Sequence, residues 1–384
     1  MKKLISCLLM STIIIGSLSA GTLAVNENEI EIKAKSAVLM DVSTGQVLYS
    51  FNENEKLYPA SVTKIMPLLL FVEALDSGKI ALDDVVTASP AAAGKGGSQI
   101  WLKEGEQMTV DELLRATAIG SANDACTALG EHIAGSEVGF VKMMNDRAKE
   151  LGMNNTNFVN CSGLDDDTTE HLTTAYDIAL MSRELLKHER IKTYTTVWMD
   201  SLRNGETQLV NTNKLVRFYN GTTGLKTGTT SKAGHCLSAS AERDGLHLIA
   251  VVMGAENSTD RFEGAKAMLN WGFANYETVT PQIDSSLFGE VDIIKGVQES
   301  VKPIITGVVP LTLKTGEKSK LETEINLADR VEAPIEKNQT LGSVSLKIDG
   351  KEIARYNLVS ENYIEKINLG HIIVRFLSSL AKSA

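Results

Sequence analysis

The stretch that decides the fold runs from Leu225 to Ala255 and reads LKTGTTSKAGHCLSASAERDGLHLIAVVMGA. Its small and apolar residues recur with a period of two, which predicts consecutive antiparallel strands. Asp244-Gly245 predicts the hairpin turn between the last two strands, because both residues tolerate the positive φ that such turns require. A helix is expected to follow, from Asp260 to about Tyr276.

The N-terminal half supplies the rest of this layer. Residues 36–52 read SAVLMDVSTGQVLYSFN, which predicts two short strands joined by a turn. Apolar residues spaced every 3.6 positions predict helices in four segments, 61–79, 109–135, 137–153 and 174–188. Pro67 would kink the first helix or start it again. The second has an N-cap signal at Thr109 followed by Glu112, and a break at Gly120-Ser121. Strands at both ends with helices between them predict an α/β (α+β) fold, in which the first hairpin returns to pair with the late strands.

After about Thr278 the pattern is β only, and its short alternating segments predict a small all-β domain. The last stretch, residues 361–384, returns to helical spacing. Its apolar positions fall on one face: Leu369, Ile372, Ile373, Phe376, Leu377 and Leu380. This apolar face is too short to cross a bilayer, so we expect an amphipathic helix attached to the membrane surface. The alternative is a helix packed on its own domain.

The N-terminus has the three parts of a secretory signal peptide. A basic start, Met1-Lys2-Lys3, is followed by an apolar run from Leu4 to Leu18 and then by small residues. We place the cleavage after Ala24, and an uncleaved membrane anchor is the alternative. The mature protein is therefore expected outside the cytoplasm.

Composition limits the classes of partner. The chain has 384 residues, 43% of them hydrophobic, and a net charge of -10, which argues against a nucleic-acid partner. Cys126, Cys161 and Cys236 remain after cleavage, and their odd number and wide spacing indicate buried side chains rather than disulfides or a zinc site. The histidines form no metal-binding or triad pattern, so neither a metal nor a cofactor is expected.

Three short motifs carry residues suited to acyl transfer. Ser61-Val62-Thr63-Lys64 begins a helix, and one helical turn brings the Lys64 amine beside the Ser61 hydroxyl. Helix N-terminal N–H groups stabilise an oxyanion, and burial lowers the pKa of a lysine so that it can act as a base. Ser121-Ala122-Asn123 lies in the interhelical break. Lys226-Thr227-Gly228 lies on a strand along which an extended substrate can add.

The same three motifs occur again in the C-terminal part, as Lys314-Thr315-Gly316, Ser360-Glu361-Asn362 and Ser379-Leu380-Ala381-Lys382. Motifs this short arise by chance, so order and context must decide between the two sets. The second set runs in reverse order. Its Lys-Thr-Gly leads into a charged turn, and its Ser-x-x-Lys ends a tail helix. We therefore assign the chemistry to the first set.

Together with GSQIWLKEGEQMTVDELL, NDACTALGEHIAGS, NCSGLDDD and LKTGTTSKAGHCLSASAER, these motifs resemble the low-molecular-mass penicillin-binding proteins that are serine D-alanyl-D-alanine carboxypeptidases. The resemblance covers nearly the whole mature chain. It implies a β-lactamase/transpeptidase-like antiparallel sheet packed with helices, a β-rich second domain and an amphipathic tail helix. The expected organisation is a signal peptide (1–24), a penicillin-binding peptidase domain (25–277), a β-rich domain (278–360) and a membrane-anchor helix (361–384).

By this resemblance, Ser61 is the nucleophile that attacks the D-Ala-D-Ala amide of peptidoglycan stem peptides, and Lys64 is its base. Ser121 would pass a proton to the departing D-alanine. Asn123 would bind the substrate amide carbonyl. Water then hydrolyses the acyl-enzyme, and β-lactams, which mimic the dipeptide, leave a slow adduct on Ser61.

The resemblance also assigns the strand that carries the third motif. Lys226 would hold Ser121 and the substrate carboxylate, while Thr227, Gly228 and Thr229 would lie along the substrate. The N–H groups of Ser61 and Thr229 would form the oxyanion hole.

Two departures from the family pattern stand out. Ser162 precedes Gly163-Leu164 where the family often has a histidine, so a deacylation role of that histidine does not carry over. The arginine that some members place shortly before Lys-Thr-Gly is also missing. Thr227 and Thr229 would then do more of the carboxylate binding. Arg217 or Arg261 would assist, unless each is a surface or structural cation.

Other readings of the motifs remain. A class A β-lactamase would need a Glu-x-x-Leu-Asn pattern between the second and third motifs, and CSGLDDDTTEHLTTAYD does not contain it. A penicillin-sensing module would need a transmembrane signalling segment. A D,D-endopeptidase that cuts peptide crosslinks stays open, because a sequence does not show the depth of a cleft.

Overall fold

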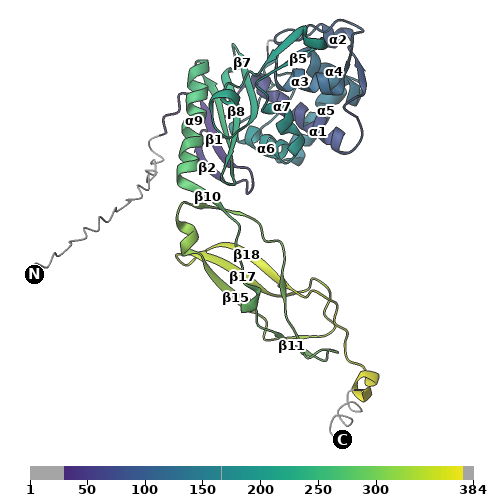
Figure 1. Cartoon of the computed structure of the whole chain (residues 1–384), viewed down its shortest axis with the longest axis vertical. Helices are drawn as coiled ribbons and strands as arrows, with labels where there is room; N and C mark the ends of the chain where they lie inside the picture. The colour runs from purple at the N-terminus through teal and green to yellow at the C-terminus, as the bar shows by residue number, and fades with distance from the viewer. Residues whose placement is uncertain (1–29, 166, 375–384) are drawn as a thin grey trace, which may run out of the picture.

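The computed structural model describes residues 30–165 and 167–374. Two parts follow one another along the long axis of the molecule: an α/β part that contains most of the helices, and an elongated β part that leads to the C-terminal helix (Figure 1). The predicted signal peptide and the end of the tail lie outside the described residues.

The α/β part is built on a five-stranded antiparallel sheet with the order β2-β1-β9-β8-β7. The first hairpin does return to pair with the late strands, as predicted, with Ser36 opposite Met253. Asp244 and Gly245 both have positive φ at the β8–β9 turn, at 50° and 81°. The strands are β1 (Ser36–Asp41), β2 (Val47–Phe51), β7 (Thr222–Thr230), β8 (Gly234–Arg243) and β9 (Leu246–Ala255).

Alternating side chains of the sheet enter two different cores. Val38 and Met40 of β1 pack with the helical layer, whereas Ala37 and Leu39 pack against α9 (Ser258–Asn275) on the other face. This period of two is the pattern that predicted the strands. The other α-helices are α1 (Ile65–Asp76), α2 (Pro90–Ala93), α3 (Val110–Ala118), α4 (Asn123–Ala134), α5 (Glu137–Glu150), α6 (Ala175–Leu186), α7 (Lys192–Thr195) and α8 (Leu215–Phe218).

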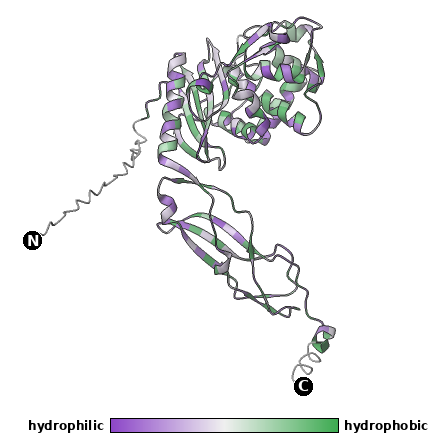
Figure 2. Ribbon diagram, viewed as in Figure 1, coloured by the Kyte–Doolittle hydropathy of each residue, from purple (hydrophilic) through white to green (hydrophobic). Residues whose placement is uncertain are grey.

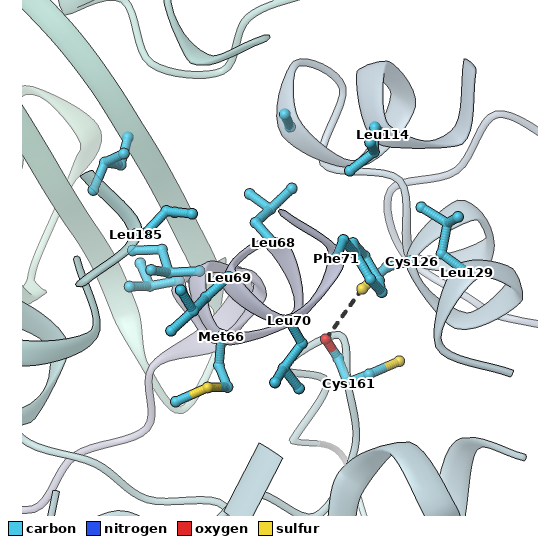
Figure 3. Close-up of a cluster of buried hydrophobic side chains, with 14 of the residues drawn as sticks. Met66, Leu68, Leu69, Leu70, Phe71, Leu114, Cys126, Leu129, Cys161 and Leu185 are labelled. Atoms are coloured by element: carbon cyan, nitrogen blue, oxygen red, sulfur yellow. Dashed lines mark hydrogen bonds between the residues drawn. The ribbon is translucent and has the colours of Figure 1, made fainter. Parts of the chain in front are cut away.

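Helix α1 runs through the middle of the helical layer. Figure 3 shows Leu68 and Phe71 directed toward α3 and α4, and Leu69 directed toward Leu185 of α6. The Phe71 ring stacks on Phe140 of α5 with centroids 5.3 Å apart. Because α1 is buried on nearly all sides, the residues that precede it are held in a fixed place.

The sequence predicted one helix from Ser61, with a kink or a new start at Pro67. A 3₁₀ helix (Ala60–Lys64) comes first instead, and α1 starts at Ile65. Pro67 is then the third residue of α1, in the first turn, where a missing N–H costs no intrahelical hydrogen bond. The new start therefore lies two residues before the proline.

The β part begins where α9 ends. β10 (Tyr276–Val279) follows the helix directly and pairs with β14 (Leu311–Lys314). Two further sheets have the orders β12-β11-β16 and β13-β18-β17-β15. Their strands are β11 (Val291–Ile294), β12 (Ser300–Val301), β13 (Ile304–Ile305), β15 (Glu322–Leu327), β16 (Arg330–Glu332), β17 (Thr340–Ile348) and β18 (Lys351–Val359). The predicted β-rich second part is thus confirmed.

Two small hairpins complete the α/β part and lie beside the helical layer. They consist of β3 (Val85–Thr87) with β4 (Gln107–Thr109), and β5 (Met199–Leu202) with β6 (Thr207–Val210). Thr109 caps α3 through a reciprocal pair of hydrogen bonds with Glu112, as the sequence predicted.

The tail begins a helix at Leu369. Leu369, Ile372, Ile373 and Val374 are all exposed, by 74%, 50%, 52% and 65% respectively. Figure 2 shows hydrophobic colour at this end of the chain, beyond the last strand. These four side chains are therefore not packed on their own domain. Among the described helices, none combines the length and the hydrophobicity needed to cross a bilayer.

Candidate active site

The first motif brings a serine and a buried lysine into direct contact. Lys64 Nζ lies 2.9 Å from Ser61 Oγ and donates a second hydrogen bond, 2.8 Å long, to the backbone carbonyl of Ser162. Lys64 is fully buried, whereas Ser61 is only half-buried. Ala60 has a φ of 48°, a strained value that sets the direction in which the chain enters the 3₁₀ helix. The Ser61 hydroxyl is thus accessible to a substrate, whereas the Lys64 amine that it contacts is shielded from water.

The environment of Lys64 favours its neutral form. Burial lowers the pKa of Lys64 to about 8, although Cys126, Cys161 and Asp124 act in the opposite direction. About a tenth of the lysine is then neutral at pH 7, far more than for a lysine in water. A neutral amine at hydrogen-bond distance is able to accept the Ser61 proton.

The second motif lies in the break between α3 and α4. Ser121 has a φ of 62° and is 3% exposed, and its hydroxyl makes no hydrogen bond to any described residue. Asn123 begins α4, and its Nδ2 donates to the carbonyl of Gly96 at 2.7 Å. Its Oδ1 is buried without a partner among the described residues. The hydroxyl of Ser121 and the second N–H of Asn123 remain available for a ligand.

The third motif lies on β7, which is the edge strand of the five-stranded sheet. Lys226 is 1% exposed, and its Nζ donates to the carbonyl of Thr227 at 3.1 Å. Burial holds the pKa of Lys226 well below its usual value, and the cations Lys64 and Arg261 add to this effect. In the described part of the chain, Lys226 makes no hydrogen bond to Ser121.

Gly228 lies directly against the backbone of Ser61. A Cβ at this position would lie 2.7 Å from the carbonyl oxygen of Pro59 and 2.8 Å from the backbone nitrogen of Ser61. No side chain fits into this space. The glycine of the third motif is therefore what allows β7 to approach the start of the first.

Arg261 and not Arg217 contacts the end of β7. Arg261 Nη1 donates to the carbonyl of Gly228 and to Thr229 Oγ1, both at 2.9 Å. Arg217 is exposed, and its guanidinium lies over the Trp198 and Phe218 rings instead. Thr229 is itself exposed, whereas the Thr227 hydroxyl donates to Thr212 Oγ1 at 2.7 Å. Thr212 lies in residues 211–218, the stretch before Lys-Thr-Gly in which the resemblance led us to look for a carboxylate-binding arginine.

No sequence motif pointed to His171. Its Nδ1 accepts the Val159 N–H at 3.1 Å, so Nε2 carries the proton and donates to Thr63 Oγ1 at 2.8 Å. Burial first, and then the Lys64 charge, lower the pKa of His171 to about 4. A neutral histidine thus holds the turn between Ser61 and Lys64. Only tertiary contacts reveal it, because His171 lies more than a hundred residues from Thr63.

The three cysteines are free and buried, as predicted. Cys126 donates to the carbonyl of Cys161 at 3.4 Å, next to Phe71 of α1 (Figure 3). Of the second set of motifs, Lys314 and Thr315 are exposed at the end of β14, and Ser360 donates to the carbonyl of Asn362 within a turn. Ser379 and Lys382 lie outside the described residues.

Comparison with known proteins identifies relatives over the whole chain. The D-alanyl-D-alanine carboxypeptidase family matches residues 23–257, and the penicillin-binding protein 5 C-terminal domain matches residues 276–366. The chain is 41% identical to the D-alanyl-D-alanine carboxypeptidase DacF of Bacillus subtilis (strain 168), with 100% of both chains covered.

Solved structures give the same relationship. Penicillin-binding protein 5 from Haemophilus influenzae superposes with a TM-score of 0.78 at 32% identity, covering 88% of this chain and 98% of that one. Penicillin-binding protein D2 from Listeria monocytogenes, in its ampicillin-bound form, has a TM-score of 0.59 at 31% identity and covers 64% of this chain and 99% of that one. About two thirds of this chain therefore resembles a protein that was solved with a β-lactam.

Proposed function

The chain belongs to the D-alanyl-D-alanine carboxypeptidase family of serine-type peptidases, and we propose that it removes the terminal D-alanine of peptidoglycan pentapeptide stems through an acyl-enzyme on Ser61. The observation that carries this proposal is the 2.9 Å contact between Ser61 Oγ and Lys64 Nζ, together with a lysine pKa of about 8. Free lysine is almost wholly protonated at neutral pH and would be a poor base.

Acylation begins when neutral Lys64 takes the Ser61 proton. The Ser61 oxygen attacks the carbonyl carbon of the D-Ala-D-Ala amide, and the carbonyl oxygen becomes an oxyanion. The backbone N–H groups of Ser61 and Thr229 stabilise that charge. The close approach of Gly228 to the Ser61 nitrogen supports this role, because it brings the backbone of β7 next to the backbone nitrogen of Ser61.

Departure of D-alanine requires a proton on its nitrogen. Ser121 passes the proton that Lys64 took from Ser61 on to the leaving amine, with Lys226 polarising the Ser121 hydroxyl, so Lys64 is neutral again. Asn123 donates its second N–H to the carbonyl of the substrate backbone. The strained φ of Ser121 and the free hydroxyl support this assignment, since strain is retained where a side chain must point into a site.

The terminal carboxylate of the substrate is held by cations and hydroxyls at the end of β7. Thr227 and Thr229 offer hydroxyls, and Lys226 offers an ammonium. Arg261 fixes Thr229 Oγ1 and adds a positive charge beside it. Water then releases the shortened peptide from Ser61, whereas a β-lactam leaves a slower adduct on the same oxygen.

The proposed place of action is the outer face of the cytoplasmic membrane. The signal-like N-terminus supports export, and the exposed apolar residues Leu369, Ile372, Ile373 and Val374 support attachment by the tail. Removal of residues 369–384 is expected to move the protein from the membrane fraction to the soluble fraction without loss of D-alanine release from a soluble peptide. Retention in the membrane fraction would contradict the attachment.

The test of the catalytic proposal is D-alanine release from a soluble pentapeptide ending in D-Ala-D-Ala. Wild-type protein is expected to release it and to be acylated by a fluorescent penicillin. Ser61→Ala should lose both activities. Ser379→Ala, which changes the serine of the second Ser-x-x-Lys, should keep both. An intact pentapeptide alongside cleavage of a crosslinked muropeptide would establish an endopeptidase instead.

A further inference from the structure

A groove separate from the residues that carry the chemistry lies beside the second motif. Its cavity volume is about 800 Å³, within the usual range for ligand sites. One wall is the loop that starts at Ile100, and the other is the hairpin of β5 and β6. The two walls are far apart in sequence and are joined by side-chain contacts.

Trp101 stands at the rim of this groove. It is 74% exposed, and its φ is 60°, a strained value for a bulky residue. The residues on both sides are fixed, because the N–H groups of Ile100 and Leu102 both donate to the Asp124 carboxylate, at 3.1 Å and 3.0 Å. The backbone that presents the exposed indole is thus fixed on both sides, in a conformation that costs energy.

The opposite wall is strained as well and is tied to the first. Arg203 and Asn204 have φ values of 51° and 55°. Arg203 donates to Glu106 Oε1 at 2.7 Å and to the carbonyl of Ile100 at 2.9 Å, so its guanidinium joins the two walls. The groove is therefore formed before any ligand arrives, which reduces the entropy lost on binding.

The groove is close to the catalytic residues. Asp124, which holds both neighbours of Trp101, directly follows Asn123 in the chain. Standard backbone dimensions then limit the Cα atoms of Trp101 and Asn123 to about 15 Å apart. A substrate whose reacting end lies at Ser61 and Asn123 is able to reach the groove with another part of the same molecule.

The polar groups of the rim fit a ligand without a strong net charge. Four polar side chains are exposed around the cavity: Lys103, Glu104, Glu206 and Gln208. The rim therefore offers both positive and negative charges, and both hydrogen-bond donors and acceptors. Within the described residues, the carboxylates of Glu104 and Glu206 have no hydrogen-bond or ion-pair partner. Two free carboxylates disfavour an anionic peptide end and are good acceptors for hydroxyl groups.

We propose that this groove binds a pyranose sugar of the glycan strand to which the stem peptide is attached. The apolar face of the sugar ring would lie on the Trp101 indole, while its hydroxyl and acetamido groups bond to the rim. Aromatic rings contribute a large contact area at low entropic cost, which suits a flat sugar face. This inference rests on the proposed function, since it extends the same substrate from its peptide end to its glycan.

Kinetics on two substrates test the inference. D-Alanine release is measured from a soluble pentapeptide with lysine at its third position, and from polymeric glycan strands that carry the same stem. Trp101→Ala is expected to lower kcat/KM on the glycan-linked substrate about tenfold, through the lost stacking, and to leave the value for the soluble peptide within about twofold. Trp101→Phe keeps an aromatic face and is expected to retain most of the glycan-linked activity.

An equal loss of kcat/KM on both substrates would overturn the inference, because the groove would then bind the peptide or its lysine ammonium. No loss on either substrate would also overturn it. Tyr363→Ala, which removes an aromatic side chain that is 53% exposed in the β part, is the matched control and should change neither value.

A binding experiment gives a second readout that needs no turnover. Ser61→Ala protein is mixed with peptide-free glycan strands, and co-sedimentation is measured with and without the additional Trp101→Ala change. Binding that depends on Trp101 supports the inference, and binding that does not depend on it overturns it. If wild-type protein releases no D-alanine from either substrate, the proposed function fails, and peptide-free glycan still tests the groove separately.

Discussion

The tripeptide Lys-Thr-Gly occurs twice in this protein, and the two copies have almost nothing in common in the fold. Lys226 of the first copy is 1% exposed on an edge strand of the central sheet, and Lys314 of the second is exposed at the end of β14. Thr227 bonds to Thr212 inside the α/β part. Thr315 bonds through its N–H to the carbonyl of Asn275, at the point where α9 passes into the β part.

The two glycines are required for different physical reasons. Gly228 leaves no room for a Cβ, which would meet the backbone of Pro59 and Ser61. Gly316 has open space around its Cα but a φ of 86°, so it serves the turn and not a close contact. One short motif can thus serve either close packing against Ser61 or the turn of a chain, and only the surrounding residues distinguish the two uses.

The largest expected effect separates the two lysines. Lys226→Ala removes a buried cation from the proposed proton path and carboxylate site, so D-alanine release is expected to fall about a thousandfold. Lys314→Ala removes an exposed side chain and is expected to leave kcat/KM unchanged. Steady-state kinetics on a soluble pentapeptide measure both, and equal losses would show that the comparison is wrong.

The second effect separates the two glycines. Gly228→Ala should push β7 away from the Ser61 backbone and lower the rate of acylation by penicillin at least about a hundredfold. Gly316→Ala is expected to leave acylation unchanged and to lower the free energy of unfolding by about 1 kcal/mol, because alanine is strained at positive φ. Stopped-flow acylation and thermal unfolding give the two values. A slower acylation in Gly316→Ala would show that the two glycines do not have different roles.

A third expectation concerns pH. Burial gives Lys64 a folded-state pKa of about 8, and only its neutral form accepts the Ser61 proton. The acylation rate constant should therefore rise about tenfold per pH unit below 8 and level off above it. Lys314→Ala should show the same profile, since its exposed amine takes no part. A flat profile between pH 6 and 9 would mean that Lys64 is not the base.

The smallest effect is expected at the junction of the two parts. Thr315→Ala removes a 3.3 Å hydrogen bond to the carbonyl of Ala274 and should lower the free energy of unfolding by only about 0.5–1 kcal/mol. Thr227→Ala, its counterpart in the first copy, removes the 2.7 Å hydrogen bond to Thr212 Oγ1 and should cost at least as much stability, but it should also raise KM for the pentapeptide. A larger KM change in Thr315→Ala than in Thr227→Ala would reverse the comparison.

Much of the fold followed from local pattern. Strands β7, β8 and β9 were visible in their period of two, and α3 in the pair Thr109 and Glu112, because these signals depend on residues a few positions apart. The pairing of β1 with β9 was predicted only from the order of elements. These parts of the structure are predictable because their signals are local in the sequence.

The contacts that shape the site are of another kind. The bond from His171 to Thr63, the carbonyl of Ser162 at Lys64 and the fit of Gly228 against Ser61 each join segments far apart in the chain. No local pattern encodes them, since each depends on how the helical layer packs on the sheet. The residue types of the site were therefore predictable, whereas the support behind them was not.

Helix α9 passes into β10 without a linker, and β10 is at once paired with β14. The chain has no free segment at this junction, so the elongated β part would set the height of the proposed active site above whatever surface holds the tail. With the tail on a membrane, the enzyme would meet only those stems that lie within one narrow range of depth in the wall. Which layer of the wall is trimmed would then be decided by the length of the β part, independently of how fast Ser61 reacts.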